Sequence, residues 1–198
     1  MGLAEAARPG VRIEGRRRAA GAPVGAEGLN ESFWPELERS TTGARGFVIR
    51  TDGASRANPG HASAGAVLID LARPDAFDPA APADASISDY LGVQTNNVAE
   101  YTAVVRALGL ARELGAREVR LLLDSMLIVE QLHGRWRVKD AKLAPLHAEA
   151  RRLLGGLDRW TAAHVRRAEN HAADALCNQA IDRALAGGPA SVVVRPGG

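Results

Sequence analysis

Runs of apolar residues divide the chain into predicted strands and helices from about residue 46 onward. Short runs of β-branched and aliphatic residues bounded by Gly, Pro or Asn are typical of strands, whereas apolar residues that recur every three or four positions are typical of helices. The strand pattern comes first, over 47–52, 64–70 and 86–94, interrupted by an Asn58-Pro59-Gly60 turn and a Pro-rich loop over 71–85. Three strands so close in sequence predict an antiparallel meander.

The apolar period becomes helical after the third strand. Val98, Tyr101, Val105 and Leu108 follow this spacing and predict a helix that Gly115 ends. The remaining elements are predicted as a helix over 97–114, a strand over 118–123, helices over 125–132 and 141–154, a strand over 160–165, and a helix over 170–186 with Asn170 as its N-cap. The last ten residues fit either a frayed end or an edge strand. This order predicts an α/β fold in which helices pack on the faces of a mixed sheet.

The two ends of the chain differ in composition from the middle. Residues 1–44 are rich in Ala, Gly, Arg and Pro, include the run Arg16-Arg17-Arg18, and show no sustained apolar face. We therefore expect a flexible tail over 1–44, one domain over 45–187 and a C-terminal tail over 188–198. The arginine run leaves open that the first tail touches phosphates.

The overall composition is that of a globular protein, with 46% hydrophobic and 24% charged residues. It excludes a wholly disordered chain, a collagen-like chain and a disulfide scaffold. No stretch approaches the ~20 apolar residues that span a bilayer, and the start lacks the apolar core of a secretory signal. The single cysteine, Cys177, cannot form an internal disulfide. Together these features predict a cytoplasmic protein without membrane association, and a monomer is the default expectation.

The net charge of +2 neither requires nor excludes a nucleic-acid partner. The candidate chemistry comes instead from four acidic residues at the ends of predicted elements. Asp52 and Asp124 end apolar strands, and Glu100 and Asp174 lie in the first turns of helices. Sites in open α/β sheets form beyond the carboxyl ends of strands, so the four acids are candidates for one site. Each one, taken alone, also fits a turn or a helix terminus.

The segments around these acids closely resemble the motifs of the type 1 ribonuclease H family. In chain order they are Thr51-Asp52-Gly53-Ala54-Ser55 followed by Asn58-Pro59-Gly60, then Thr95-Asn96-Asn97-Val98-Ala99-Glu100-Tyr101, Leu123-Asp124-Ser125, and Glu169-Asn170-His171-Ala172-Ala173-Asp174. The resemblance covers residues 46–186. It implies the ribonuclease H-like fold, a five-stranded mixed sheet with three antiparallel and two parallel strands flanked by helices.

The resemblance implies an endonuclease that hydrolyses the RNA strand of RNA–DNA hybrids and leaves 5′-phosphate and 3′-hydroxyl ends. It assigns catalysis and metal binding to Asp52, Glu100, Asp124 and Asp174, with two Mg²⁺ ions per site and Mn²⁺ as a substitute. Asp52 would contact both ions, Glu100 and Asp124 would share one, and Asp174 would hold the other. Because clustered carboxylates repel one another, we expect a raised pKa for at least one of them in the metal-free protein.

Substrate contacts are implied by the same resemblance. An amide both donates and accepts hydrogen bonds, which suits 2′-hydroxyl groups and base edges, and mixed basic and aromatic residues suit phosphates and sugars. The substrate-binding candidates are Gly53, Asn58, Asn96, Asn97, Ser125, Trp136 and Lys139. Without the resemblance, the asparagines also fit turns, and the segment 133–139 also fits a polar loop with one core tryptophan.

The chain departs from the better-known bacterial members of the family. The stretch 132–143 is too short for their basic protruding helix, Met126 replaces a residue that is often polar, and the loop before Asp174 lacks a histidine that assists turnover. Arg166, Arg167 and His171 are the candidates for that auxiliary role. This shorter form resembles a branch found in archaea and some bacteria, some members of which also cut double-stranded RNA.

Three alternatives remain open: a nucleic-acid-binding module on the same fold without catalysis, a related nuclease acting on double-stranded RNA, and a nuclease of the same superfold acting on DNA ends or junctions. The intact acids argue against the pure binder, because carboxylates repel phosphates unless cations intervene. The spacing of the motifs and the Asn96-Asn97 pair argue against the third. The sequence has no GxxxxGK phosphate-binding motif and no zinc-type Cys/His cluster.

Overall fold

Three antiparallel strands begin the fold, as the apolar pattern predicts. They are β1 (Gly46–Arg56), β2 (Gly60–Asp70) and β3 (Ala85–Gln94), and they pair in sequence order. The structure is a computed structural model that describes residues 44–197. The predicted flexible tail therefore lies, apart from residue 44, outside the described residues.

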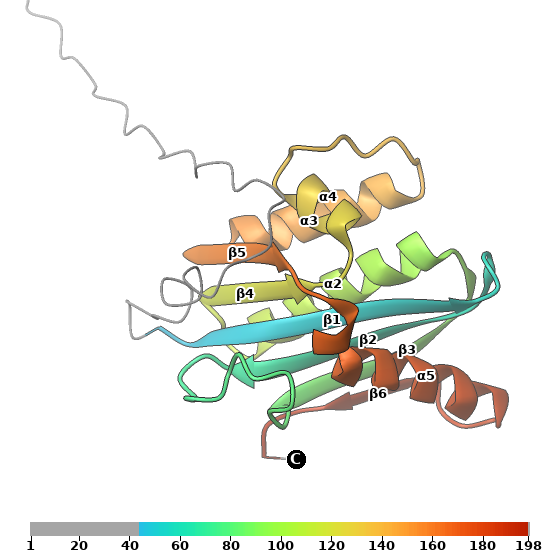
Figure 1. The fold of residues 1–198 in the computed structure, drawn as a ribbon, viewed down its shortest axis with the longest axis horizontal. Coiled ribbons are helices and arrows are strands. Elements are labelled where there is room, and N and C mark those ends of the chain that lie inside the picture. Colours follow the sequence, from blue (N-terminus) through green and yellow to red (C-terminus); the bar gives the residue numbers. More distant parts are fainter. Residues whose placement is uncertain (1–43, 198) are drawn as a thin grey trace, which may run out of the picture.

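Two parallel strands extend the sheet on the other side of β1. β4 (Glu118–Leu123) pairs with β1, and β5 (Arg159–His164) pairs with β4. In the part of the chain that the structure describes, the strand order is β5-β4-β1-β2-β3-β6 (Figure 1). The predicted mixed α/β sheet with three antiparallel and two parallel strands is confirmed.

The sixth strand corrects the predicted count of five and the assignment of 188–198 as a tail. β6 (Ser191–Val194) pairs antiparallel with the outer edge of β3. Gly187 adopts a positive φ of 81°, which turns the chain back toward the sheet. The three consecutive valines favour a strand once the free edge of β3 is beside them. Of the two readings left open for this segment, the edge strand is the one observed.

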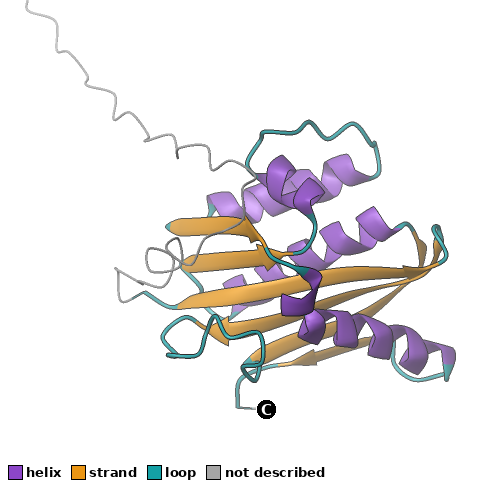
Figure 2. Cartoon of the chain, viewed as in Figure 1, coloured by secondary structure: helices purple, strands orange, loops and turns teal. Residues whose placement is uncertain are grey.

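Helices cover both faces of the sheet (Figure 2). The helices α2 (Asn96–Glu113) and α4 (Leu143–Gly155) pack together on one face, and α5 (His171–Leu185) packs on the other (Figure 1). The short α3 (Met126–Leu132) and the 3₁₀ turn η2 (Arg167–Glu169) complete the described helices. No helix within residues 44–197 is long and apolar enough to span a bilayer.

The main core lies between the sheet and the α2–α4 pair. Apolar side chains of alternate strand positions, such as Phe47, Ile49 and Leu121, meet Val104 and Leu154 there and are fully or almost fully buried. A smaller cluster around Val48 and Ile69 lies on the opposite face. These two layers hold β1 and β4 rigidly in the middle of the molecule.

Two glycines let the helices approach the sheet closely. A Cβ atom on Gly53 of β1 would lie 2.1 Å from the backbone nitrogen of Glu100 in α2. A Cβ atom on Gly65 of β2 would lie 2.3 Å from the carbonyl oxygen of Ala173 in α5. Because Gly65 pairs with Asp52, both helices meet the sheet at the level of that aspartate, one on each face.

Candidate active site

The acidic site begins where β4 stops and β1 continues. The last pair of the parallel ladder joins Thr51 to Leu123, so Asp52 and Asp124 both lie just beyond it. β1 itself runs on to Arg56, which corrects the predicted strand end near Asp52, because pairing with β2 continues there. Asp52 is buried, whereas Asp124 is partly exposed.

The N-terminal turns of two helices bring the other acids to the same place. Glu100 lies in α2 directly above Gly53, where the glycine permits backbone contact. Asp174 lies in the first turn of α5, and the buried Cys177 of that helix donates from Sγ to the carbonyl oxygen of Asp52 at 3.2 Å. The four acids therefore lie at one edge of the sheet, although they are far apart in sequence.

A hollow of about 390 Å³ opens between these elements. Three of the predicted acids, Asp52, Glu100 and Asp124, line it. Its other lining residues are Gly53, Ala54, Ser55, Asn96 and Arg167. Asp174 accepts a hydrogen bond from Nη2 of Arg167 at 2.9 Å and so lies beside the hollow.

A neighbouring donor orients each carboxylate. The backbone N–H of Gly53 donates to Oδ1 of Asp52 at 2.8 Å. Glu100 accepts from Nδ2 of Asn96 at 2.8 Å and from Oγ of Ser125 at 2.7 Å. Asp124 accepts from Nδ2 of Asn170 at 3.0 Å. The donors hold the acids in place while mutual repulsion acts to separate them.

Burial makes ionisation costly at two of the acids. Burial raises the pKa of Asp52 to about 7, and the negative charge of Asp124 adds to the effect. Burial also raises the pKa of Glu100, against the opposing effect of the Ser125 hydrogen bond. A raised pKa was expected from mutual repulsion of the acids; the pKa is raised at two of them, but burial is the main cause and repulsion by Asp124 the smaller one.

The donor set suits hard divalent cations, which prefer carboxylate oxygens. The costly ionisation of Asp52 supports this fit, because a bound cation would supply the missing positive charge. Within residues 44–197, however, no three His, Cys, Asp or Glu side chains stand together as a ready-made metal site. The side chains are instead engaged with Asn96, Ser125, Arg167 and Asn170.

The predicted substrate contacts fall into two groups. The first group lies at the acids. Asn96 and Ser125 donate hydrogen bonds to Glu100, and Asn58 accepts at Oδ1 from the backbone N–H of Asn96 at 3.1 Å. Asn97 is exposed on the first turn of α2. Asn58, Asn96 and Ser125 thus also shape the site itself.

Trp136 and Lys139 do not line the hollow. They lie in the connection between α3 and α4, where half of the Trp136 surface is exposed and Arg137 and Lys139 are exposed beside it. Of the auxiliary candidates, Arg167 reaches the hollow, whereas Arg166 and His171 are exposed and do not line it.

Two asparagines beside the acids were missed as site residues. Asn170 was predicted only as a helix cap, and Asn178 donates from Nδ2 to Oδ2 of Asp174 at 3.2 Å. Asn178 stands four residues after Asp174 on α5, a spacing that places two side chains on one helix face and that the sequence already shows. The Asn170 contact joins segments 46 residues apart, so no local pattern predicts it.

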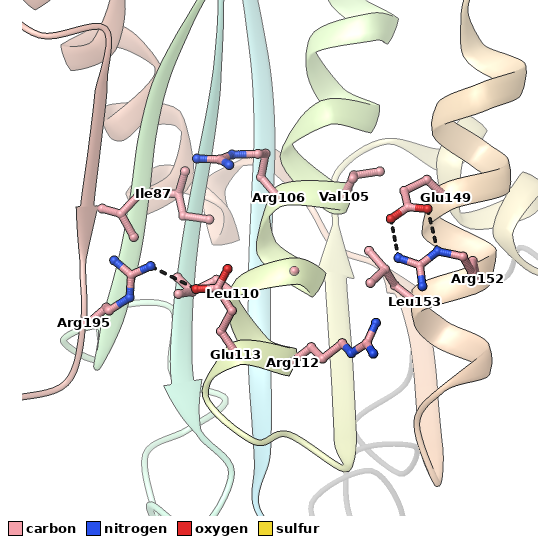
Figure 3. A pocket seen from close by; sticks show the side chains of 12 residues that line it. Ile87, Val105, Arg106, Leu110, Arg112, Glu113, Glu149, Arg152, Leu153 and Arg195 are labelled. Atoms are coloured by element: carbon pink, nitrogen blue, oxygen red, sulfur yellow. Dashed lines mark hydrogen bonds and ion pairs between the residues drawn. The ribbon is translucent and has the colours of Figure 1, made fainter.

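A second hollow, of about 550 Å³, lies along the outer part of α2 and contains none of the predicted site residues (Figure 3). Ion pairs between Glu113 and Arg195 and between Glu149 and Arg152 border it. A further ion pair joins Arg106 to Asp89, so three of the four arginines that line this hollow have acidic partners within the chain. The carboxylate-lined hollow is therefore the candidate active site.

Comparisons with known proteins place the chain among its relatives. The profile of the family described as "Reverse transcriptase-like" matches residues 50–180. Ribonuclease HI of Halobacterium salinarum is 43% identical over 133 residues. The match covers 67% of this chain, and the chain spans 63% of the length of that protein.

Solved structures extend the agreement to the fold. The crystal structure of RNase H1 from Halobacterium salinarum has a TM-score of 0.63 and 41% identity, and the match covers 69% of this chain and 98% of that one. The crystal structure of LC11-RNase H1 in complex with an RNA/DNA hybrid has a TM-score of 0.59 and 34% identity, covering 70% and 99% of the two chains. The chain therefore belongs to the type 1 ribonuclease H family.

Proposed function

We propose that this protein is an endonuclease that hydrolyses the RNA strand of RNA–DNA hybrids and leaves 5′-phosphate and 3′-hydroxyl ends. The observation that carries the proposal is the meeting of Asp52, Glu100 and Asp124 in one hollow, with Asp174 beside it. The relatives named ribonuclease H and the hybrid-bound LC11 structure support the same substrate.

Members of this family use divalent metal ions. We propose two Mg²⁺ ions per site, replaceable by Mn²⁺, with Asp52 contacting both, Glu100 and Asp124 sharing one, and Asp174 holding the other. Bound cations would activate the attacking water and stabilise the leaving 3′-oxygen. Loading the site would exchange the hydrogen bond between Arg167 and Asp174 for a metal contact.

The residues of this chain prepare the site for those cations. Burial makes the Asp52 charge costly without them, which favours cation binding. Asn96 and Ser125 fix both oxygens of Glu100, so that this side chain needs little reordering. Arg167 lies within the hollow and is the best placed of the auxiliary candidates to meet a phosphate or the product.

Substrate recognition is proposed to use two surfaces. Gly53, Asn58, Asn96 and Ser125 lie at or next to the acids, and Asn97 is exposed on the first turn of α2; these five residues would face the minor groove of the hybrid. Trp136 and Lys139, exposed beside Arg137, would contact the sugars and phosphates of the DNA strand. Arg166 and His171 are exposed near the start of α5 and remain weaker auxiliary candidates.

The decisive assay uses three end-labelled duplexes, an RNA–DNA hybrid, a double-stranded RNA and a DNA duplex, each with Mg²⁺ or Mn²⁺. We expect cleavage of the hybrid's RNA strand, and we expect Asp124→Asn to abolish it while leaving the protein folded. Tight hybrid binding without cleavage under either metal would support a binding module instead. Cleavage of the double-stranded RNA at a similar rate would widen the substrate class.

The compartment, the oligomeric state and the domain bounds are proposed from the sequence. We propose a cytoplasmic monomer whose catalytic domain covers 45–187, with β6 added to its sheet. Burial raises the pKa of the single thiol, Cys177, to about 12, so this cysteine suits a core position rather than a disulfide. Light scattering of the purified chain tests the monomer, and deleting residues 1–43 tests whether that segment aids hybrid binding.

A further inference from the structure

Asn170 stands at the N-cap of α5 but does not cap it. Its side chain makes no hydrogen bond to the first turn of the helix. An asparagine at this position normally stabilises the helix by accepting a backbone N–H of that turn. This chain forgoes that stabilisation, so the side chain serves another purpose.

The amide of Asn170 joins three elements at the acidic site. Its Nδ2 donates to Oδ1 of Asp124 at 3.0 Å and to the carbonyl oxygen of Thr51 at 2.9 Å. Thr51 precedes Asp52 in β1, and Asp124 follows β4. One buried NH₂ group therefore ties the start of α5 to the middle of β1 and to the residue that follows β4. Both partners are acceptors, so only the NH₂ end of the amide fits there.

A second contact holds the same junction. Arg50, buried in β1, donates from Nη1 to the carbonyl oxygen of Glu169 at 2.9 Å. Consecutive residues of β1, Arg50 and Thr51, thus bind consecutive residues before α5, Glu169 and Asn170. The backbone around Asn170 is fixed independently of its side chain, which makes the amide available for orienting Asp124.

The remaining atom of the amide points to the same role. Oδ1 of Asn170 is buried and has no hydrogen-bond partner among the described residues. A buried acceptor without a partner is unfavourable. A side chain that served stability alone would turn to cap α5 and satisfy this atom.

We propose that Asn170 is a positioning residue that orients the Asp124 carboxylate for cation binding. The inference rests on the proposed nuclease function. Asn170 does not touch the reacting atoms. It acts by holding Oδ1 of Asp124 in a fixed position at the hollow, and groups that orient metal ligands in this way influence metal affinity strongly.

The test compares the full chain with Asn170→Ser and Asn170→Ala. Serine can cap α5 but is too short to reach Asp124 or Thr51. The gained cap should offset part of the stability lost with these two hydrogen bonds, so the thermal midpoint of Asn170→Ser in EDTA should fall less than that of Asn170→Ala. Both variants should bind Mn²⁺, followed by electron paramagnetic resonance without substrate, about 10–100-fold more weakly. On a hybrid substrate, kcat should fall while KM stays near the wild-type value.

Ser88→Ala is the matched control. Ser88 of β3 also ties α5 to the sheet, because its Oγ donates to the carbonyl oxygen of Leu176 at 2.9 Å, but it contacts none of the acids. This variant should lose thermal stability and keep the wild-type affinity for Mn²⁺.

The outcomes distinguish a failure of the Asn170 positioning role from a failure of the proposed nuclease function. If the Asn170 variants bind Mn²⁺ as tightly as the wild type, or lose affinity only in step with Ser88→Ala, the positioning role is wrong while the nuclease proposal stands. If the wild type itself neither binds Mn²⁺ nor cleaves the hybrid, the proposed function fails, and the positioning role fails with it.

Discussion

At the scale of single residues, Asp52 stands out because it is buried among other acids. Burial and the charge of Asp124 raise its pKa to about 7, far above the value of about 4 typical of an unfolded chain. The folded, metal-free protein therefore holds a proton on Asp52 over a pH range in which the unfolded chain has released it. Its stability should fall as pH rises through this range.

We predict that Asp52→Asn abolishes cleavage and stabilises the metal-free protein above pH 7. An amide has no charge to desolvate, so the free energy of unfolding in EDTA should rise by about 2–4 kcal/mol at pH 8, and the gain should shrink toward zero near pH 4. Urea unfolding at a series of pH values measures it. A difference that stays constant with pH would contradict this account of Asp52.

The sequence predicts which residues lie near the acids better than it predicts the hydrogen-bond partners of those residues. Asn96 and Ser125 were expected to contact the substrate, and the structure shows both donating to Glu100. The residue types were informative because amides and hydroxyls belong beside carboxylates and nucleotides alike. The partner of each group depends on distances between elements, which a single sequence does not contain.

At the scale of elements, the close packing of α2 on β1 places Glu100. The sequence shows a glycine after Asp52 but not that a helix lies over it. The structure leaves no room for a Cβ atom at Gly53, whereas a Cβ atom on Gly109, on a half-exposed face of α2, would meet nothing within 4 Å. These two glycines therefore make a matched pair.

We predict opposite effects for the two substitutions to alanine. Gly53→Ala should destabilise the fold by roughly 3 kcal/mol or more and displace Glu100, because the clash is with backbone. Gly109→Ala should stabilise it by about 0.5–1 kcal/mol through helix propensity, with unchanged cleavage. Chemical denaturation of both variants checks this. A tolerated Gly53→Ala would show that α2 can shift without cost.

Element ends were harder to predict than elements. β1 extends past Asp52 to Arg56, and β6 forms where a tail or an edge strand were both conceivable. In both cases the deciding factor is a neighbouring strand with free hydrogen-bonding groups. Local propensity describes a segment alone and does not include that neighbour.

Removing residues 190–198 should separate stability from function. The deletion exposes the edge of β3 and breaks the ion pair between Arg195 and Glu113, so we expect a loss of roughly 1–3 kcal/mol. β6 is three strands away from β1 in the sheet, so the cleavage rate per folded molecule should not change. A large drop in that rate at a temperature where the variant is folded would contradict the prediction.

At the scale of the whole molecule, a cation bound by the acids should stabilise the folded state. Four segments far apart in sequence meet at one edge, so an ion bound there holds β1, β4, α2 and α5 together. An ion binds the folded chain and not the unfolded one, and it therefore shifts the unfolding equilibrium.

We predict that Mg²⁺ raises the melting temperature of the wild type. At 100 times its dissociation constant it should add about 2.7 kcal/mol to the free energy of unfolding. Asp124→Asn should reduce the shift strongly, and KCl at equal ionic strength should not reproduce it in the wild type. Equal shifts with Mg²⁺ and KCl would mean that the ion acts by general screening alone.

The sequence by itself determined the fold class, the order of the elements and the chemical types present, because periodicity, glycines and carboxylates are properties of the chain. It also indicated which four acids belong together, through its resemblance to a known family. Only the tertiary structure decided that Gly53 and Gly65 admit two helices at the level of Asp52, that β6 joins the sheet, and that Asn170 turns away from its helix toward Asp124. These outcomes depend on contacts between distant segments, where burial and hydrogen-bond partners are set only once the chain has packed.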